Sequence, residues 1–585
     1  MRTHCYPSAL ALLLVLVFPV APAYAAPVVE VSVLGIEGAL LANVLAYLSI
    51  EQQKNDPDLS EGRIRGLYEK APDEIKTALQ PFGYYRPGIR SELIRRGKGF
   101  LARYTIYPGK PVRIREVNLA FSGEGSYDEE LRKVRKNFPV KNGNVLEHAV
   151  YEKAKQELQE TAVEQGYLDA RFLTHTVRVY PEQDAAVVDL HFETGPLYRF
   201  GDVTFNQDIL KNKFLERFVP FKKGDPYKTA KLLELQNALY SSDYFRQVDI
   251  RPRRDKAEGL NIPLEIDLSP RKRNKYMFGL GYGTDTGFRG ILGWEDRWIN
   301  RRGHHFSTEL RLSQIQKNLT ARYIVPVDHP ATDHLDYTAA WVDERTAVSK
   351  SETRLVGASY NRSRPVRQES YYLNYQKERF SLGDESGRAT LLLPGASWTR
   401  IKADDRIYTS RGSRIIMDVR GAHTALFSSV SFAQLRLNAK FIRRPWDPGR
   451  IILRGDFGYS FIAGFADLPV SQRFFAGGDQ SVRGYAYRSL GPLDSAGNVI
   501  GGRDLVVGSA EYEQRIYGKW GAAVFYDIGN AINKLSDPLK QGTGVGVRWR
   551  SPVGLVRLDF AWALNALSAS NHTRWRIHLN IGPDL

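Results

Sequence analysis

The second half of the chain consists of short segments in which apolar and polar residues alternate. From about residue 274 onward, an apolar side chain occupies every second position over stretches of roughly ten residues. One stretch places Val545, Val547 and Trp549 between glycines and arginines, and another runs from Val556 to Leu564. A period of two predicts β-strands, and one apolar face opposite an arginine-rich face predicts a transmembrane barrel.

The spacing of these segments predicts the size of the barrel. Sixteen segments begin near Lys275, Phe288, His304, Lys317, His334, Ser351, Val366, Arg388, Arg411, Ser431, Arg450, Asp504, Trp520, Lys540, Gly554 and Arg574. An even number of strands allows an antiparallel sheet to close on itself. The connection over residues 465–503 is much longer than a turn and rich in glycine, which is typical of a functional loop.

The first half of the chain contains a threefold repeat. An acidic-Val-polar-apolar tetrapeptide begins at Glu30, Glu116 and Asp202, at two equal spacings of 86 residues. Helical periodicity follows each tetrapeptide, and two alternating segments follow the helices, as at residues 169–180 and 185–193. The predicted order is strand, helices, strand, strand. Such units expose edge strands that can bind a further strand, although rigid spacers without a ligand are the alternative.

The N-terminus predicts export. Arg2, the apolar run from Leu10 to Val20 and the small-residue site ending at Ala25 indicate a signal peptide over residues 1–25. The single cysteine, Cys5, lies in that segment, so we expect no disulfide in the exported chain. No later stretch reaches the roughly 18 apolar residues of a membrane-spanning helix.

The charge and the absent motifs narrow the function. The formal net charge is +17, and the basic residues are scattered from Arg63 to Arg576, which favours lipid phosphates over nucleic acid as the anionic partner. We find no P-loop, no His-Glu-x-x-His and no Gly-x-Ser-x-Gly, and therefore expect no catalytic residue, no metal site and no cofactor. A barrel hydrolase with a clustered Ser, His and acid stays open as an alternative.

Two short motifs lie in and after the long connection. Val482-Arg483-Gly484-Tyr485 lies within the connection, and Phe525, Asp527 and Gly529 share the polar face of a later strand. Glu511 lies on the polar face of the strand between them. An arginine facing Glu511 and Asp527 would form a charge-paired lock inside the barrel, whereas spacing alone also allows a solvated arginine.

Together with the repeated N-terminal units, these motifs resemble the outer-membrane assembly and two-partner secretion superfamily. The resemblance implies α+β periplasmic POTRA (polypeptide-transport-associated) repeats followed by an all-β 16-stranded transmembrane β-barrel. It implies POTRA units at residues 26–112, 113–197 and 198–271, and a barrel at 272–585 whose loop 465–503 turns inward. Three units resemble the TamA branch, whereas BamA has five units and two-partner secretion transporters have two.

The resemblance also implies a function and partners. In the superfamily the loop arginine contacts lumenal acids, which here would be Glu511 and Asp527. We expect an outer-membrane assembly factor of a Gram-negative bacterium that inserts or translocates clients such as autotransporters. Its periplasmic arm would bind an inner-membrane-anchored, TamB-like partner, and a role in lipid transport is also compatible. The alternative is a two-partner-secretion-type export pore for one dedicated substrate.

The first and last predicted strands form a weak seam in this interpretation. Gly279, Gly281 and Gly283 share one face of the first strand, and Ile581-Gly582-Pro583 ends the last one. Glycine offers little packing and proline has no backbone donor. We therefore hypothesise that the seam parts and that a client strand pairs with the exposed edge. The alternative is that the glycines only accommodate the curvature of the barrel.

Overall fold

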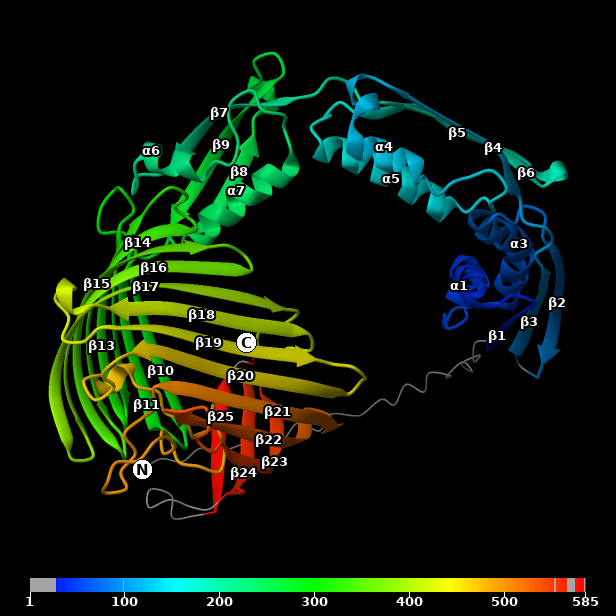
Figure 1. Ribbon diagram of the computed structural model, residues 1–585. Coiled ribbons are helices and arrows are strands. Elements are labelled where there is room, and N and C mark those ends of the chain that lie inside the picture. Colours follow the sequence, from blue (N-terminus) through cyan, green and yellow to red (C-terminus); the bar gives the residue numbers. More distant parts are fainter. Residues whose placement is uncertain (1–27, 98, 552–553, 566–573, 583, 585) are drawn as a thin grey trace, which may run out of the picture. The chain divides into compact units, whose positions relative to one another are not determined.

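The computed structural model describes residues 28–97, 99–551, 554–565, 574–582 and 584. The predicted signal peptide and Pro583 lie outside the described residues. Within them the strands form three three-stranded sheets and one sixteen-stranded sheet (Figure 1). This arrangement confirms the predicted fold class, α+β repeats followed by an all-β barrel. None of the helices in the described part of the chain is both long and apolar enough to cross a membrane.

The chain forms two compact units. The first contains the residues up to Arg199 together with 224–230 and 259–261, and the second contains the remaining residues through the barrel. Most of the third repeat therefore belongs to the same compact unit as the barrel, whereas the first two repeats form a unit of their own.

The first repeat folds in the predicted order of strand, helices, strand, strand. Its elements are β1 (Val29–Leu34), α1 (Gly38–Tyr47), α2 (Ser49–Gln52), α3 (Glu61–Leu79), β2 (Gly88–Arg96) and β3 (Gly99–Tyr107). Strand β3 lies in the middle of the sheet, parallel to β1 and antiparallel to β2. The apolar stripe of α3 buries Ile64 and Ile75 in one core with Tyr104 of β3.

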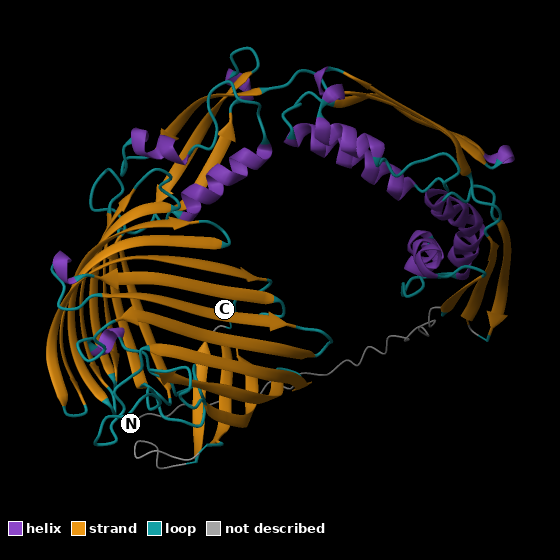
Figure 2. Ribbon diagram, in the orientation of Figure 1, coloured by secondary structure: helices purple, strands orange, loops and turns teal. Residues whose placement is uncertain are grey.

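The second repeat has the same topology. Its elements are β4 (Arg113–Ser122), α4 (Glu129–Lys136), α5 (His148–Glu164), β5 (Arg171–Tyr180) and β6 (Ala185–Glu193). Strand β6 is central, parallel to β4 and antiparallel to β5. Helix α4 begins after Asp128, whose carboxylate accepts the N–H groups of Glu130 and Leu131 at 2.9 and 3.1 Å. Figure 2 shows the helices of both repeats in purple, beside their orange sheets.

A left-handed glycine follows the long helix in each of these repeats. Gly83 has φ +89° and Gly166 has φ +97°. The carbonyl oxygen of Gly83 accepts the N–H of Val112 at 2.8 Å, and that of Gly166 accepts the N–H of Tyr198 at 3.0 Å. A Cβ on Gly166 would lie 2.3 Å from a backbone oxygen. The Gly-Tyr turns seen in the sequence therefore need glycine, and they bond to the chain entering the next repeat.

The third repeat packs against the barrel within the second compact unit. Its elements are β7 (Arg199–Asn206), α6 (Asn212–Leu215), α7 (Thr229–Ser241), β8 (Phe245–Pro252) and β9 (Asn261–Pro270), in sheet order β7-β9-β8. Its core, which includes Phe214 and Tyr244, extends to Trp298 and Ala331 in two connections of the barrel. The hydroxyl of Tyr244 hydrogen-bonds to His305 Nε2 at 2.7 Å.

A carboxylate at this junction gathers three cations. Asp243 accepts a hydrogen bond from Arg297 Nε at 2.9 Å and lies 3.2 Å from Arg271 Nε and 3.5 Å from Lys275 Nζ. Burial opposes ionisation of Asp243, but the hydrogen bond from Arg297 and the surrounding positive charges outweigh it and lower the pKa of the carboxyl. The junction is therefore fixed by charge as well as by apolar contact.

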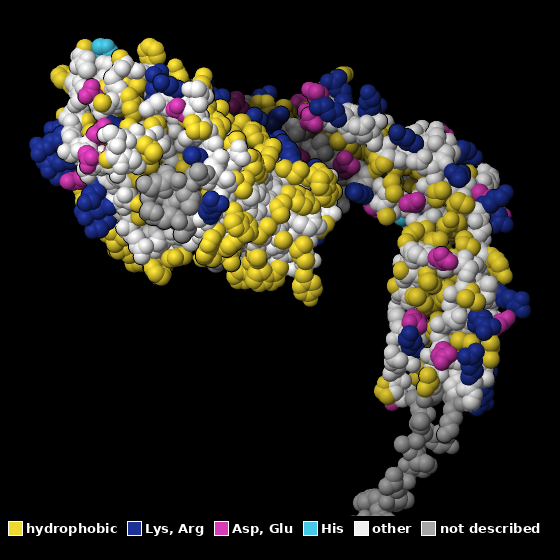
Figure 3. All heavy atoms as spheres, turned by 60° about the horizontal axis from the view of Figure 1, so that its bottom comes forward, with side chains coloured by type: hydrophobic (Ala, Val, Ile, Leu, Met, Phe, Trp, Pro, Cys, Tyr) yellow, Lys and Arg dark blue, Asp and Glu magenta, His cyan; other side chains and the backbone are white. Residues whose placement is uncertain are grey.

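The barrel consists of sixteen antiparallel strands. They are β10 (Asn274–Gly283), β11 (Gly287–Asp296), β12 (His305–Ser313), β13 (Gln316–Pro326), β14 (Asp333–Arg345), β15 (Ser349–Ser363), β16 (Arg367–Leu382), β17 (Glu385–Ala403), β18 (Gly412–Ala422), β19 (Phe432–Arg443), β20 (Gly449–Ile462), β21 (Asp504–Tyr517), β22 (Trp520–Ile532), β23 (Lys540–Ser551), β24 (Gly554–Ala563) and β25 (Trp575–Gly582). Each begins within three residues of its predicted start. Hydrophobic side chains cover much of the barrel wall in Figure 3, as the alternation predicted.

We predict that Asp243→Asn loosens the third repeat from the barrel. Asn tolerates the left-handed backbone of residue 243 (φ +63°), so the change removes the charge alone. We expect a loss of about 1 kcal/mol for this partly exposed site, seen as roughly fivefold faster amide hydrogen exchange in β8.

The pH dependence follows from the lowered pKa of Asp243. Ionised Asp243 stabilises the junction between the third repeat and the barrel. This stabilisation is fully present above the ordinary pKa of an aspartate, about 3.9, and is lost as the pH falls through the lowered pKa of Asp243. The exposed Asp249→Asn on β8 is the matched control. Equal exchange in the two variants would contradict the role of Asp243.

Candidate functional site

The long loop between β20 and β21 contributes a small apolar core of its own. Val482 and Tyr485 are buried in a cluster with Phe474 of the loop, Leu505 of β21 and Ala531 of β22. The hydroxyl of Tyr485 donates to the backbone oxygen of Gln541 at 3.2 Å. The loop therefore lies against the inner wall of β21–β24.

Two glycines allow this close approach. Gly484 has φ +94°, and a Cβ there would lie 2.8 Å from the backbone of β24 at Trp562 and Ala563. On the wall opposite, a Cβ at Gly542 would lie 2.0 Å from the backbone oxygen of Arg483. Any larger residue at either position would push the loop off the wall.

Arg483 is the centre of the site. Its side chain is 3% exposed. Nε and Nη2 donate to the two carboxylate oxygens of Asp527 at 2.8 and 2.9 Å, and Nη1 donates to Glu511 at 2.7 Å and Asp559 at 3.0 Å. The guanidinium stacks 3.4 Å from the ring centroid of Phe525. Forked bonding of this kind needs the planar guanidinium.

A second arginine continues the network along the wall. Arg548 of β23 donates to Glu511 at 2.6 Å, to Glu513 at 2.8 Å and to Asp559 at 2.5 Å. Each of these acids accepts hydrogen bonds from two arginines. Glu511 and Asp559 accept from Arg483 and Arg548, and Glu513 accepts from Arg548 and Arg450. Because opposite charges alternate from β21 to β24, the buried charges stabilise each other in a region with little water.

The network ends on Asp584, close to the C-terminus of the sequence. Its side chain is 0% exposed and accepts hydrogen bonds from Arg450 Nη1 at 2.6 Å and from the N–H of Thr409 at 3.0 Å. Arg557 also donates to this carboxylate, and Lys440 Nζ donates to the backbone oxygen of Asp584 at 2.7 Å. These partners belong to four separate parts of the barrel, so Asp584 is held on the inner side of the wall.

The two ends of the sixteen-stranded sheet, β10 and β25, meet without a backbone ladder in the part of the chain that the structure describes. The N–H of Leu579 on β25 donates to Thr284 Oγ1, beside the end of β10, at 3.3 Å. On β10, Phe278 is 80% exposed and Leu280 is 98% exposed. Among the described residues, β10 pairs with β11 on one side and has no ladder on the other, which leaves a free strand edge.

The inward loop bridges the two sides of this seam. The N–H of Asp479 in the loop donates to Asp285, in the turn after β10, at 2.6 Å. The carboxylate of Asp479 accepts a hydrogen bond from Asn580 of β25 at 2.8 Å. The N–H of Gly484 donates to His578 Nε2 of β25 at 3.4 Å. Side chains and the loop therefore hold the seam where a ladder is missing.

The structure brings together some of the residues singled out in the sequence and separates others. The loop motif meets Glu511, Phe525 and Asp527, whereas Gly529 lies further along β22, opposite Val507. Ile581 and Gly582 pair with Val556 and Leu555 of β24, not with β10. The expected pairing of the first strand with the last is thus not formed by these residues.

The glycines of the first strand differ in their surroundings. A Cβ on Gly281 would meet nothing within 4 Å, and one on Gly279 would make only ordinary contact with Ile291. Only at Gly283 is space short, since a Cβ there would lie 2.1 Å from Arg289 Nη2. Because the guanidinium end of Arg289 is flexible and can move aside, close packing does not require glycine at these three positions.

Sequence reasoning missed several members of the network. Asp559 and Arg548 lie on polar faces that the alternation identified, but their contact with Arg483 or Glu511 depends on strand order and register. Asp479 and Asp285 lie in connections, where no periodic pattern marks a residue. Asp584 follows the last strand and has no local signal that would place it in the interior.

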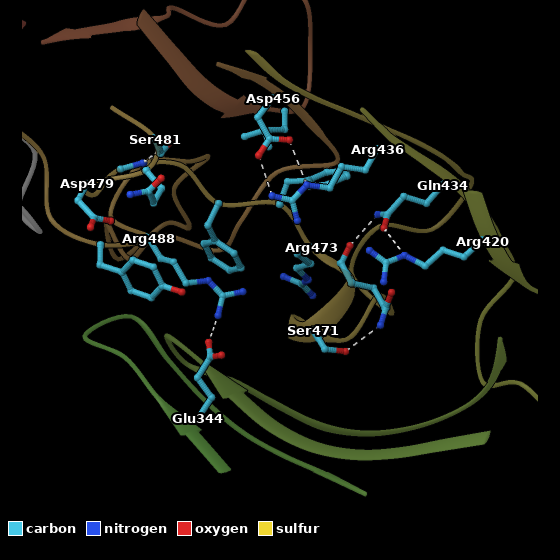
Figure 4. Close-up of a pocket in the computed structure, with 17 residues that line it drawn as sticks. Glu344, Arg420, Gln434, Arg436, Asp456, Ser471, Arg473, Asp479, Ser481 and Arg488 are labelled. Atoms are coloured by element: carbon cyan, nitrogen blue, oxygen red, sulfur yellow. Dashed lines mark hydrogen bonds and ion pairs between the residues drawn. The ribbon is translucent and has the colours of Figure 1, made fainter. Parts of the chain in front are cut away.

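A cavity of about 400 Å³ lies beneath the loop (Figure 4). Its polar walls include Arg436, paired with Asp456 at 3.0 and 2.7 Å, and Arg488, paired with Glu344. Arg473 donates to the backbone oxygen of Leu468 at 2.7 Å. The loop therefore narrows the lumen without filling it, and the cations beneath it are already paired.

Comparisons with family models match most of the chain. Residues 274–584 match the Omp85 superfamily domain, residues 30–108 match the POTRA domain TamA domain 1, and residues 198–271 match the surface antigen variable number repeat of the POTRA family. The matched regions coincide with the barrel, the first repeat and the third repeat.

Two curated relatives and one solved structure are similar to the chain. The outer membrane protein assembly factor BamA of Nitratidesulfovibrio vulgaris is 24% identical over 62% of this chain and 48% of its own length. BamA of Neorickettsia risticii is 21% identical over 74% of this chain and 62% of its own length. The chain thus spans about half to three fifths of these relatives. The crystal structure of Haemophilus ducreyi BamA lacking POTRA domains 1–3 matches with TM-score 0.69 at 15% identity, covering 81% of this chain and 100% of that one, which shows a shared fold.

We predict that Arg483→Ala releases the loop from the wall. Removing the central cation leaves three buried carboxylates short of a partner, which costs about 3–5 kcal/mol. The expected results are a lower urea midpoint of barrel unfolding in detergent and new trypsin cleavage at Arg488 in the same loop. Arg483→Lys should show much of this loss because an ammonium cannot fork.

The control is Arg503→Ala, at the end of the same loop and outside the network. It should leave both readouts near those of the unsubstituted protein. If Arg483→Ala behaves like Arg503→Ala, the network does not hold the loop.

Proposed function

Because this chain belongs to the Omp85 superfamily, whose domain spans residues 274–584 and more than half of its length, we propose that it inserts or translocates client proteins at its seam. The barrel lies in the outer membrane, and the POTRA repeats lie on the periplasmic side. In this proposal a client strand hydrogen-bonds to the free edge of β10 and leaves laterally into the membrane. Outer-membrane proteins and autotransporters, which are themselves rich in strands, are the proposed clients.

The missing ladder between β10 and β25 is the observation that carries this proposal. A closed antiparallel barrel pairs all of its backbone groups, and separating two paired strands would break a whole ladder at once. Here the contact rests on Thr284, on His578 of β25, which lies 3.7 Å from Asp285, and on the loop residues Asp479 and Gly484. A small number of side-chain bonds can be exchanged for a client strand at little cost in free energy.

The inward loop has a defined place in this mechanism. Arg483 fixes the loop to the wall of β21–β24, and Asp479 at the same loop reaches both sides of the seam. Opening the seam therefore requires that the Leu579–Thr284 bond and the contacts of Asp285 break, while the Arg483 network remains. The proposed role of Val482-Arg483-Gly484-Tyr485 is positioning, because these residues hold the loop where Asp479 contacts both sides of the seam.

The periplasmic arm provides further edges for binding. Each three-stranded sheet leaves two strands with one unpaired side, among them β2 and β5. Unpaired backbone groups can accept a strand from another protein. We propose that these edges receive clients and bind an inner-membrane-anchored partner of the TamB type.

We predict that locking the seam abolishes client insertion. Thr284→Cys with Leu579→Cys places two thiols at the existing contact between the ends of the sheet. Under oxidation, insertion of an autotransporter client into vesicles containing the full-length protein should stop, and a reductant should restore it. The single native cysteine, Cys5, lies in the predicted signal peptide and would not interfere.

The matched control joins two strands that are already paired. Val556→Cys with Ile581→Cys links β24 to β25 at directly opposite positions. This disulfide should leave insertion unchanged under both conditions. Full insertion with the seam locked would rule out lateral release through β10 and β25.

We predict that the partner binds through the first two repeats. The full-length protein, solubilised in detergent with its own membranes, should recover one large inner-membrane-anchored protein. A variant lacking residues 26–197 retains the second compact unit and should lose that protein. Recovery of a single secreted protein instead, by either form, would favour the two-partner-secretion-type export pore.

A further inference from the structure

A shallow hollow lies on the outer wall of the barrel, away from the seam. It has a volume of about 530 Å³, within the roughly 300–1,000 Å³ typical of small-molecule sites. Its floor includes Ala321 of β13 and Ala339 of β14, and its rim includes Leu319, Trp341 and Val356. The alanines are directly opposite each other, so two small side chains leave a gap between large ones.

These residues face outward. Side chains alternate between the two faces of each strand. On β14, Glu344 faces the lumen because it pairs with Arg488 of the inward loop. On β16, Gln376 faces the lumen because it donates to Ser471 of the same loop at 2.8 Å. Ala339 and Trp341 of β14 and Tyr375 and Lys377 of β16 lie at the alternate positions and therefore point outward. Val356 of β15 is 63% exposed. In the outer membrane, the hollow therefore opens onto the acyl chains of the surrounding lipid.

The hollow lies toward the end of the barrel that is remote from the third repeat. Arg217 of that repeat donates to the backbone oxygen of Pro326, where β13 ends. The turn that follows Pro326 and precedes β14 therefore marks the periplasmic end. Arg354 near the start of β15 and Lys377 near the end of β16 lie toward the opposite, cell-surface end.

Cations of like charge face one another across this wall. Arg354 is directly opposite Lys377, Arg345 is opposite Lys350, and Arg379 is opposite Arg388. Two acids share this face: Asp343 lies 3.1 Å from Arg345, and Glu352 is directly opposite Arg379. Like charges in such positions repel and destabilise a sheet unless an anion lies between them. At the same end of β18–β20 the outward positions are Gly421, Ala433 and Phe461, none of which is charged.

The Arg354–Lys377 pair borders the hollow directly. Arg354 is 68% exposed and lies 2.9 Å from Glu352, which also accepts a hydrogen bond from Trp341 Nε1 at 3.2 Å. Lys377 lies 5.7 Å from the ring centroid of Tyr375 and has no ion-pair partner among the described residues. One positive charge at the rim is thus left without an anion.

We propose that this wall is a binding site for an acylated lipid whose phosphate headgroup carries a net negative charge. An acyl chain occupies the hollow over Ala321 and Ala339, and the phosphate lies between Arg354 and Lys377. The guanidinium can hold two phosphate oxygens while the ammonium supplies a point charge. The phosphate supplies the anion that Lys377 lacks among the described residues.

Native mass spectrometry of the full-length protein tests this site. The probes are phosphatidic acid and phosphatidylcholine with the same acyl chains, each titrated into detergent solution. We expect phosphatidic acid to bind in preference, and Arg354→Gln with Lys377→Gln to weaken its binding at least about tenfold, since each cation near a lipid surface contributes to affinity. Ala339→Leu fills the hollow without altering charge and should also reduce binding, which separates a lipid from free phosphate.

The matched control is Arg400→Gln with Lys402→Gln. These residues face outward from β17 near its periplasmic end, and the change removes the same charge from the same wall. Preference for phosphatidic acid should survive it. Equal binding of both lipids to the unsubstituted protein, or equal losses in the two double variants, would overturn the site. Unchanged migration of each variant in semi-native gels establishes that the barrel is folded.

Discussion

Arg483 carries a full positive charge into the interior of the barrel, and the arrangement of the inner wall depends on meeting that charge. Three carboxylates from three strands, Glu511, Asp527 and Asp559, surround its guanidinium. Those carboxylates would themselves be costly if the arginine were absent. The loop, the wall and the register of β21–β24 therefore stabilise one another, and the network holds the loop in one position.

This rigid side of the barrel contrasts with the seam. Buried ion pairs extend from Arg483 through Arg548 to Arg450 and Asp584, whereas the first and last strands share no ladder within the described residues. The loop is fixed where the charges are dense, and it reaches the seam through Asp479 and Gly484. The proposed opening at the seam would leave this wall intact.

Charged side chains have different surroundings at the two ends of the barrel. At the periplasmic end, Asp243 and Tyr244 hold the third repeat against the barrel. On the outer wall near the cell-surface end, Arg354 and Lys377 face each other without a shared anion. The first arrangement is satisfied within the chain, whereas in the second Arg354 is paired with Glu352 and Lys377 has no ion-pair partner among the described residues. The same residue types thus indicate internal structure in one place and a binding site in another.

The sequence by itself determined the fold class and the sixteen strands, because the period of two along a strand is a local property that a single segment displays. The sequence also predicted that Arg483 meets Glu511 and Asp527, because the alternation of apolar and polar residues placed both acids on lumenal faces. Tertiary structure decided the remaining partners. Asp559 and Arg548 reach the cluster through the register of four strands, and Asp584 reaches Arg450 from a position 134 residues away in the chain. Tertiary structure likewise decided that β10 and β25 meet without a ladder, because the pairing of two distant strands depends on the closure of the whole sheet and not on the composition of either one.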